Sequence, residues 1–137
     1  MASILKVDTI TGVSTAGSIA ITGEGNSTTT NLQQGLAKAW VHAEGDASGA
    51  AAADSFNVAS MADNGTGDYD MNMSNAMNSI RYMAAVTMGA DSDTNSGADL
   101  VGSAGIASSS TVRMRCHNTS SHQDGAYAGC SAHGDLA

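Results

Sequence analysis

Cysteine and histidine side chains gather toward the end of the sequence, where residues of these types could bind zinc. The group consists of Cys116, His117, His122, Asp124, Cys130 and His133. Its spacing, C-H-x4-H-x7-C-x2-H, contains no C-x2-C pair and matches no established zinc signature. We therefore predict no metal site and expect the two cysteines to be small apolar strand residues. A disulfide across a hairpin is conceivable for them, but the cytoplasmic origin that we expect argues against it.

A second candidate metal site is the acidic stretch 91–99, which reads D-x-D-x-N-x-G-x-D and resembles the start of a calcium-binding loop. Its sixth position is Ser96, where the turn of such a loop needs glycine. Its twelfth position is Gly102, where a glutamate would complete the coordination. The stretch is therefore predicted to be a solvated loop.

Asp63, Asp68 and Asp70 lie close enough in the sequence to suggest the paired carboxylates of a glycosidase. We place them at the tip of a hairpin and on the solvent face of a strand, where raised pKa values are not expected. The sequence contains no G-x-S-x-G elbow and no phosphate- or dinucleotide-binding loop. We predict no catalytic residues and no cofactor, and we interpret the protein as non-enzymatic.

The clearest structural pattern is a β-hairpin over residues 55–73. Polar and apolar residues alternate on both sides of the turn sequence Asp63-Asn-Gly-Thr-Gly67, as they do in half-buried strands. One face of each strand should point into the core or toward another copy of the chain. The side chains on these faces are Phe56, Val58, Tyr69, Met71 and Met73.

Residues 38–137 read as the main domain. Alternating segments separated by loops rich in glycine, serine and asparagine predict an all-β fold, an antiparallel sandwich or barrel. The expected strands are 38–44, 55–61, 68–74, 80–88, 111–117 and 126–133. The expected loops are 45–54, 89–99, 102–110 and 118–125. Loops of this length often carry binding functions.

The first 37 residues are too sparse in strands to form a domain alone. Residues 1–25 hold short β-branched runs, and we interpret them as an attachment segment. The apolar residues that we expect to make the attachment are Ile4, Leu5, Val7, Ile10, Ile19 and Ile21. Residues 26–37 are interpreted as a linker and neck, in which Leu32, Leu36 and Trp40 recur at helical spacing.

The composition limits the possible partners. Lys+Arg is 5 and Asp+Glu is 13, which gives a net charge of −8 and argues against binding to nucleic acid or anionic lipid. Hydrophobic residues reach 42%, but many are alanine and aromatic residues make up only 4%. Such a core is weak, so we expect copies of the chain to associate. No apolar run is long enough to insert into a membrane, and no leader sequence is recognisable.

Several motifs resemble those of short fibres and other virion structural proteins of tailed phages, especially phages of marine bacteria. They are the opening Met1–Gly12 and the segments Gly17–Gly25, Leu32–Trp40, Ser55–Val58, Asp63–Tyr69 and Gly134–Ala137. The strand after Tyr69 and the last strand depart from this group in their side chains. The resemblance implies an N-terminal segment that attaches to the particle and a β-rich knob, here expected to be jelly-roll-like and homotrimeric.

The expected function is that of a structural protein of a phage virion, a short tail fibre or appendage assembled in the host cytoplasm. Its partners would be other virion proteins and, through the knob loops, a host surface glycan or protein. A capsid decoration or head-fibre protein with the same fold is the alternative. A glycan depolymerase is a third hypothesis.

Overall fold

The computed structural model describes residues 5–12, 19–22, 29–45, 50–89 and 100–136. The chain divides into two units, Met1–Leu36 and Ala37–Ala137. Each unit is described by itself.

The first unit contains a small β-ribbon. Strands β1 (Ala20–Thr22) and β2 (Thr29–Asn31) pair antiparallel, and the single-turn helix α1 (Leu32–Gly35) follows directly. The amide of Leu32 donates a hydrogen bond to the carbonyl of Ile19 at 2.8 Å, which joins the start of the helix to the ribbon. The helix ends at Gly35, so the helical spacing of Leu32, Leu36 and Trp40 does not correspond to one helix, and Trp40 lies in the strand that we expected over 38–44.

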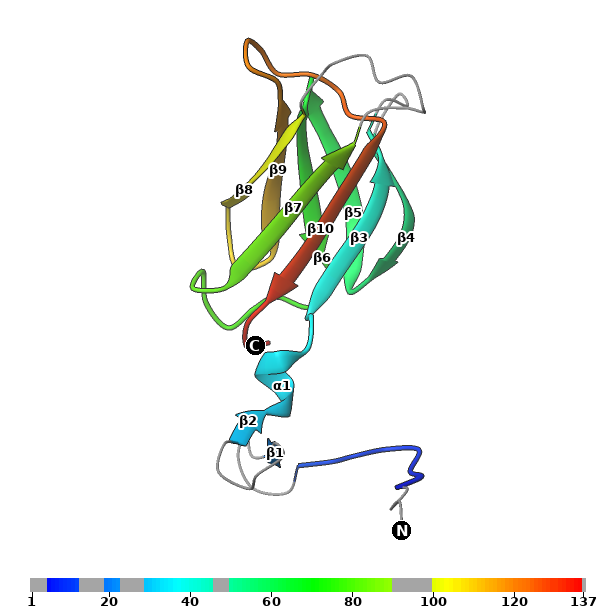
Figure 1. Cartoon of the computed structure of the whole chain (residues 1–137), viewed down its shortest axis with the longest axis vertical. Helices are drawn as coiled ribbons and strands as arrows, with labels where there is room; N and C mark the ends of the chain where they lie inside the picture. The colour runs from blue at the N-terminus through cyan, green and yellow to red at the C-terminus, as the bar shows by residue number, and fades with distance from the viewer. Residues whose placement is uncertain (1–4, 13–18, 23–28, 46–49, 90–99, 137) are drawn as a thin grey trace. The chain divides into compact units, whose positions relative to one another are not determined.

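The second unit consists of two four-stranded antiparallel sheets that face each other (Figure 1). The first sheet has the order β4-β3-β10-β7, and the second has the order β5-β6-β9-β8. The strands are β3 (Ala39–Glu44), β4 (Ala51–Phe56), β5 (Val58–Gly65), β6 (Asp68–Met73), β7 (Met83–Gly89), β8 (Val101–Ile106), β9 (Thr111–His117) and β10 (Tyr127–His133). The predicted all-β, antiparallel class is confirmed.

The connectivity is not that of a jelly roll. Three consecutive pairs, β3–β4, β5–β6 and β8–β9, each stay within one sheet. A jelly roll instead passes between its two sheets at most connections. The strand β10 lies between β3 and β7 and pairs antiparallel with both.

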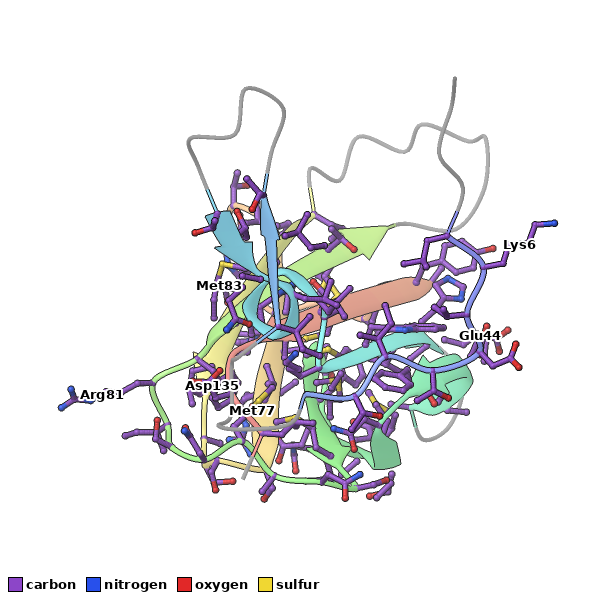
Figure 2. The ribbon with its side chains drawn as sticks, turned by 90° about the horizontal axis from the view of Figure 1, so that it is seen from below. Lys6, Glu44, Met77, Arg81, Met83 and Asp135 are labelled. Atoms are coloured by element: carbon purple, nitrogen blue, oxygen red, sulfur yellow. The ribbon has the colours of Figure 1, made fainter. Side chains whose placement is uncertain are left out.

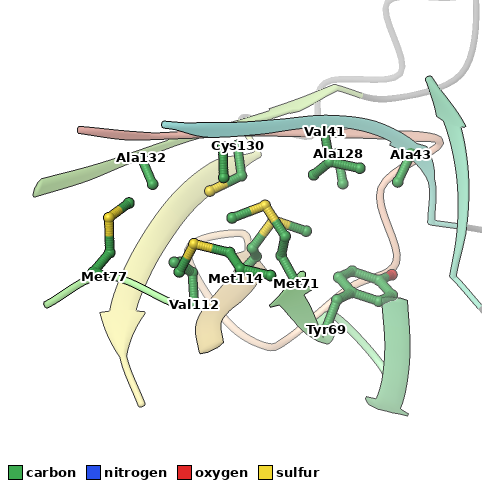
Figure 3. Packing of buried hydrophobic residues seen from close by; sticks show 12 residues of the cluster. Val41, Ala43, Tyr69, Met71, Met77, Val112, Met114, Ala128, Cys130 and Ala132 are labelled. Carbon is green, nitrogen blue, oxygen red and sulfur yellow. The ribbon is translucent and has the colours of Figure 1, made fainter. Parts of the chain in front are cut away.

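Small and flexible side chains fill the space between the sheets. Alternate residues of each strand point inward, because successive side chains of a strand lie on opposite faces. Met71 and Met114 of the second sheet point toward the first sheet, where Val41, Ala128 and Cys130 meet them (Figure 3). Methionine adapts to the irregular gaps that alanine leaves. The space between the sheets is therefore filled although few of the buried side chains are aromatic.

The predicted hairpin is present as β5 and β6, with Tyr69 and Met71 fully buried and Met73 6% exposed. The predicted first strand, 55–61, is not one continuous strand, because it is interrupted at Asn57. Asn57 has a φ of 56°, and at this residue the chain leaves the first sheet and enters the second. As a result Phe56 ends β4 with 54% of its surface exposed and does not belong to the core.

The side chain of Asn57 stabilises this corner. Its amide donates to the carbonyl oxygens of Lys38 at 2.9 Å and Asn75 at 3.0 Å, and its Oδ1 accepts from the amide of Asn75 at 2.8 Å. Asparagine adopts left-handed backbone angles more readily than most residues. Val58, the next residue, is half-buried against the core.

Two predicted loops are strands in part. Residues 51–56 form β4 and residues 101–106 form β8, although we expected loops over 45–54 and 102–110. The predicted strand 80–88 begins later, at Met83. The stretches 46–49 and 90–99 of the expected loops lie outside the described residues.

Candidate functional site

The cysteines and histidines near the end of the chain do not form a metal centre in the described part of the structure. There, no three His, Cys, Asp or Glu side chains lie close enough together to hold a metal ion. The rings of His117 and His122 are 6.4 Å apart, centre to centre. Cys116 and Cys130 are free thiols buried in the sandwich. Burial raises the pKa of Cys130 to about 12, so this thiol is protonated and unreactive at neutral pH.

The acidic stretch 91–99 lies outside the described residues. The carboxylates of the hairpin lie within the described residues. The Oδ1 of Asp63 accepts a hydrogen bond from the amide of Gly65 at 2.8 Å, which is a common way to stabilise a turn. Asp63 thus contributes to the turn geometry that the sequence predicted.

Asp68 and Asp70 pair with arginines on the outer face of the second sheet. Nε and Nη2 of Arg113 donate to the two carboxylate oxygens of Asp70, both at 2.9 Å. Asp68 lies 3.3 Å from Arg113 and 3.7 Å from Arg115. The hydrogen bonds from Arg113 hold the pKa of Asp70 below its ordinary value. A general acid needs a raised pKa, which Asp70 does not have. Together with Asp68, Arg113 and Arg115 it forms a cross-strand charge ladder.

A partly buried hydrogen-bond network that the sequence did not reveal joins three segments of the knob. The hydroxyl of Tyr69 lies 2.7 Å from the carbonyl oxygen of Gly45 and 2.8 Å from Oδ1 of Asp124. The same Oδ1 accepts from the amide of Gly67 at 2.7 Å. Burial and the neighbouring Asp124 raise the pKa of Tyr69. These hydrogen bonds connect Gly45, which follows β3, and Asp124, which lies between β9 and β10, to the hairpin turn and the start of β6.

The outer face of the first sheet carries most of the chain's aromatic residues. Trp40 of β3 lies opposite Phe56 of β4, and the ring of His42 stacks on Tyr127 of β10 with 5.8 Å between centroids and 15° between planes. Phe56 is 54% and Tyr127 47% exposed. We call this surface the aromatic face. It is formed by the outward positions Trp40, His42, Phe56, Met83, Ala85, Tyr127, Gly129 and Ser131.

The rim of the aromatic face carries the charged residues. Glu44 and Met83 lie at opposite ends of the face (Figure 2). Asp54 lies on β4, an edge strand of this sheet, opposite His42. Lys and Arg are absent from the outward strand positions of this sheet in the described part. The outer face of the second sheet is different, because it carries the ladder of Asp68, Asp70, Arg113 and Arg115.

Within the second unit, the residues that we predicted for the neck and core fall into two groups, one on the surface and one in the interior. Trp40 and Phe56 lie on the aromatic face, whereas Tyr69, Met71 and Met73 fill the core of one chain. In the first unit Leu32 is half-buried and Leu36 is 54% exposed.

The apolar residues predicted to attach to a particle are mostly exposed in the first unit. The exposed fractions are 79% for Leu5, 53% for Val7, 57% for Ile10 and 54% for Ile21. Ile19 is half-buried and Ile4 lies outside the described residues. Within the described part, no helix has the length and apolar character to cross a membrane.

Comparison with models of protein families, with curated proteins and with solved structures finds no match to this chain.

Proposed function

We propose that this protein is a non-enzymatic structural protein of a phage virion, a short tail fibre or appendage. One observation carries the proposal: the chain joins a closed sandwich to a first unit that leaves its apolar side chains exposed. Leu5, Val7, Ile10 and Ile21 are each more than half exposed. Two paired strands of three residues cannot be stable alone in water. Such a segment is suited to being completed by another protein.

Strand addition is the mode of attachment that fits this segment. A short ribbon with unpaired edges can extend a sheet of a neighbouring protein through main-chain hydrogen bonds, while its apolar side chains enter pockets. In this proposal residues 1–25 dock on the particle and residues 26–37 form a neck. The second unit is then the knob, present as a homotrimer, and its loops, including 118–125, face the host surface.

The knob itself supports a structural role. Asp63 stabilises a turn, Asp70 takes part in an ion-pair ladder and Asp124 takes part in a partly buried network, and each of these stabilises the fold. An adhesive knob of this kind would contact a host glycan or protein without changing it chemically.

Cryo-EM of intact virions tests the proposal. We expect density for the sandwich on the tail, with the first unit ordered against a particle protein. Density on the head would instead show a capsid decoration or head-fibre protein. Absence of the protein from purified particles, judged by mass spectrometry, would refute a virion role altogether.

The attachment segment can be tested by substitution. Ile21→Asp places a charge on the exposed ribbon, so we expect it to reduce incorporation into particles at least tenfold. Val101→Asp is the matched control, because Val101 is a similarly exposed apolar residue of the knob (51%). Equal incorporation of the two variants would contradict attachment through the ribbon.

Hydrolysis of host polysaccharide is checked separately. Purified protein that releases no reducing ends agrees with a non-enzymatic role. Release that survives in Asp68→Asn and Asp70→Asn would show an activity located elsewhere in the chain.

A further inference from the structure

The distribution of the aromatic residues is unusual for a protein with so few of them. The chain has five, and the structure places Trp40, Phe56 and Tyr127 on the outside of the first sheet. The core between the sheets is filled mainly by alanine and methionine. Phe56 and Tyr127, which could bury large apolar areas, are therefore left about half-exposed in a single chain, and Trp40 is partly exposed. A surface of this kind indicates an interaction site.

We infer that the aromatic face is the contact through which copies of this chain pack in the oligomer. The inference rests on the proposed homotrimer, and it names the surface that the trimer uses. It assigns Trp40, Phe56 and Tyr127 to the interface between knobs, with Met83 toward one end of that interface.

The position of β3 in the chain favours a second copy over a foreign partner. Trp40 follows the neck residue Leu36 by four positions, and each residue spans at most about 3.6 Å, so their Cα atoms lie within about 15 Å of each other. Chains that meet at the neck would therefore start their β3 strands from nearby positions. The aromatic face is the outward side of that strand and its two neighbours.

The charge distribution agrees with this placement. Protein interfaces are depleted in charge and enriched in aromatic residues at their centres. Trp40, Ser131 and Ala85 form an uncharged row across the middle of the face. Glu44 and Asp54 lie nearer the loop end and the outer edge, where they can stay hydrated. The opposite outer face carries the paired charges of Asp70 and Arg113, which would lose hydration in a contact.

The size of the face suggests that it acts together with the neck. Four strands about 4.8 Å apart and six residues long cover roughly 400 Å² in plan. A stable pair of proteins buries about 800 Å² on each partner. Loss of either the neck contact or the aromatic contact should therefore weaken the assembly.

The single tryptophan gives a direct measurement. Trp40 is the only Trp in the chain, so the intrinsic Trp fluorescence reports on this face alone. We expect acrylamide to quench Trp40 at least threefold less in the oligomer than in dissociated chains. Light scattering of the full wild-type chain should give the mass of a trimer. The single variants Phe56→Glu and Tyr127→Glu should each give the mass of a monomer. Val101→Glu, on the other sheet, should leave mass and quenching unchanged.

Each outcome decides the inference. Far-ultraviolet circular dichroism and a cooperative melt establish that the variants are folded, and a Trp40→Phe variant gives a second, milder test of mass. A trimer that survives both charge substitutions would overturn the assignment of the face, yet would leave the virion role intact. A monomeric wild type would overturn the trimer as well. Quenching protection of a monomer by added neutral oligosaccharide would show that a sugar, not a second copy, occupies the face.

Discussion

The hydroxyl of Tyr69 shares its one proton between the carbonyl oxygen of Gly45 and Oδ1 of Asp124, which lies 55 residues further along the chain. This contact links strand β6 to Gly45, just after β3, and to Asp124, in the segment between β9 and β10. Tyr69 itself is fully buried, whereas Asp124 is an exposed residue. The host-facing loops of the proposed fibre therefore begin from anchored positions.

Removal of this hydroxyl should destabilise the knob. In Tyr69→Phe the carbonyl oxygen of Gly45 loses this donor, while Oδ1 of Asp124 keeps the hydrogen bond from the amide of Gly67, and the expected cost is about 1–3 kcal/mol of unfolding free energy. A double-mutant cycle with Asp124→Ala, followed by urea unfolding, should show coupling between the two sites. Tyr127→Phe, which removes a hydroxyl from a half-exposed ring, is the control and should cost little. Strict additivity in the cycle would mean that the hydrogen bond contributes nothing.

The turn at Gly67 should not tolerate a side chain. Gly67 has a φ of 63°, and a Cβ atom there would collide with the carbonyl oxygen of Cys116 and approach that of Gln123 to 2.6 Å. We expect Gly67→Ala to cost at least about 2 kcal/mol, from backbone strain and from displacement of the chain. Gly105→Ala is the control, because its nearest neighbour would lie at 3.8 Å. Equal melting temperatures for the two variants would contradict the clash.

The ion pair between Asp70 and Arg113 should make the knob sensitive to acid. The pKa of Asp70 is lowered in the folded chain from its ordinary value of 3.8, chiefly by the hydrogen bonds from Arg113. The unfolded chain therefore takes up the proton first. The stabilisation is present above pH 3.8 and is lost as the pH falls through the folded pKa.

Urea unfolding at several pH values below 5 measures this effect. Asp70→Asn should unfold with a shallower loss of stability in acid than the wild type. Asp54→Asn, which removes a carboxylate that takes part in none of the ion pairs of the described residues, should keep the wild-type slope. Parallel acid profiles for wild type and Asp70→Asn would exclude the pair as the cause.

Alkali should act through the buried thiol of Cys130. Burial raises its pKa from 9.0 to about 12, so between these values the unfolded chain loses the proton and the folded chain keeps it. Stability should then fall as the pH rises, by up to about 1.4 kcal/mol per pH unit from this group. Cys130→Ala should show a smaller alkaline slope, whereas Ser131→Ala, on the outward side of the same strand, should not. An unchanged slope in Cys130→Ala would assign the alkaline loss to other groups, such as Tyr69.

The strands with strong contrast between their faces could be predicted from the sequence. Tyr69 and Met71 alternate with acidic residues in β6, and Met114 alternates with arginines in β9. β4 and β8 consist largely of alanine, glycine and serine, so neither face stands out and the sequence predicts loops over most of both. Local pattern carries no information where the side chains on the two faces are alike.

One residue, Asn57, prevented the aromatic face from being predicted from the sequence. The alternation of Phe56 and Val58 runs through Asn57 without interruption in the sequence, which predicted that both point inward. The left-handed backbone of Asn57 turns the chain between sheets, so the two residues belong to different layers. The network of Tyr69 and Asp124 could not be foreseen either, because contacts between distant residues depend on the final packing.

The central position of β10 constrains how the knob is made. This strand is the last one in chain order, and it pairs with β3 and β7 on its two sides. Until it emerges from the ribosome, the first sheet remains two separate parts whose inner edges lack their hydrogen-bond partners. Nascent chains crowded on one messenger RNA would then expose edges that can pair with one another. Rapid completion of synthesis past Tyr127 therefore protects the product from aggregation, and a frameshift before it would leave no folded knob.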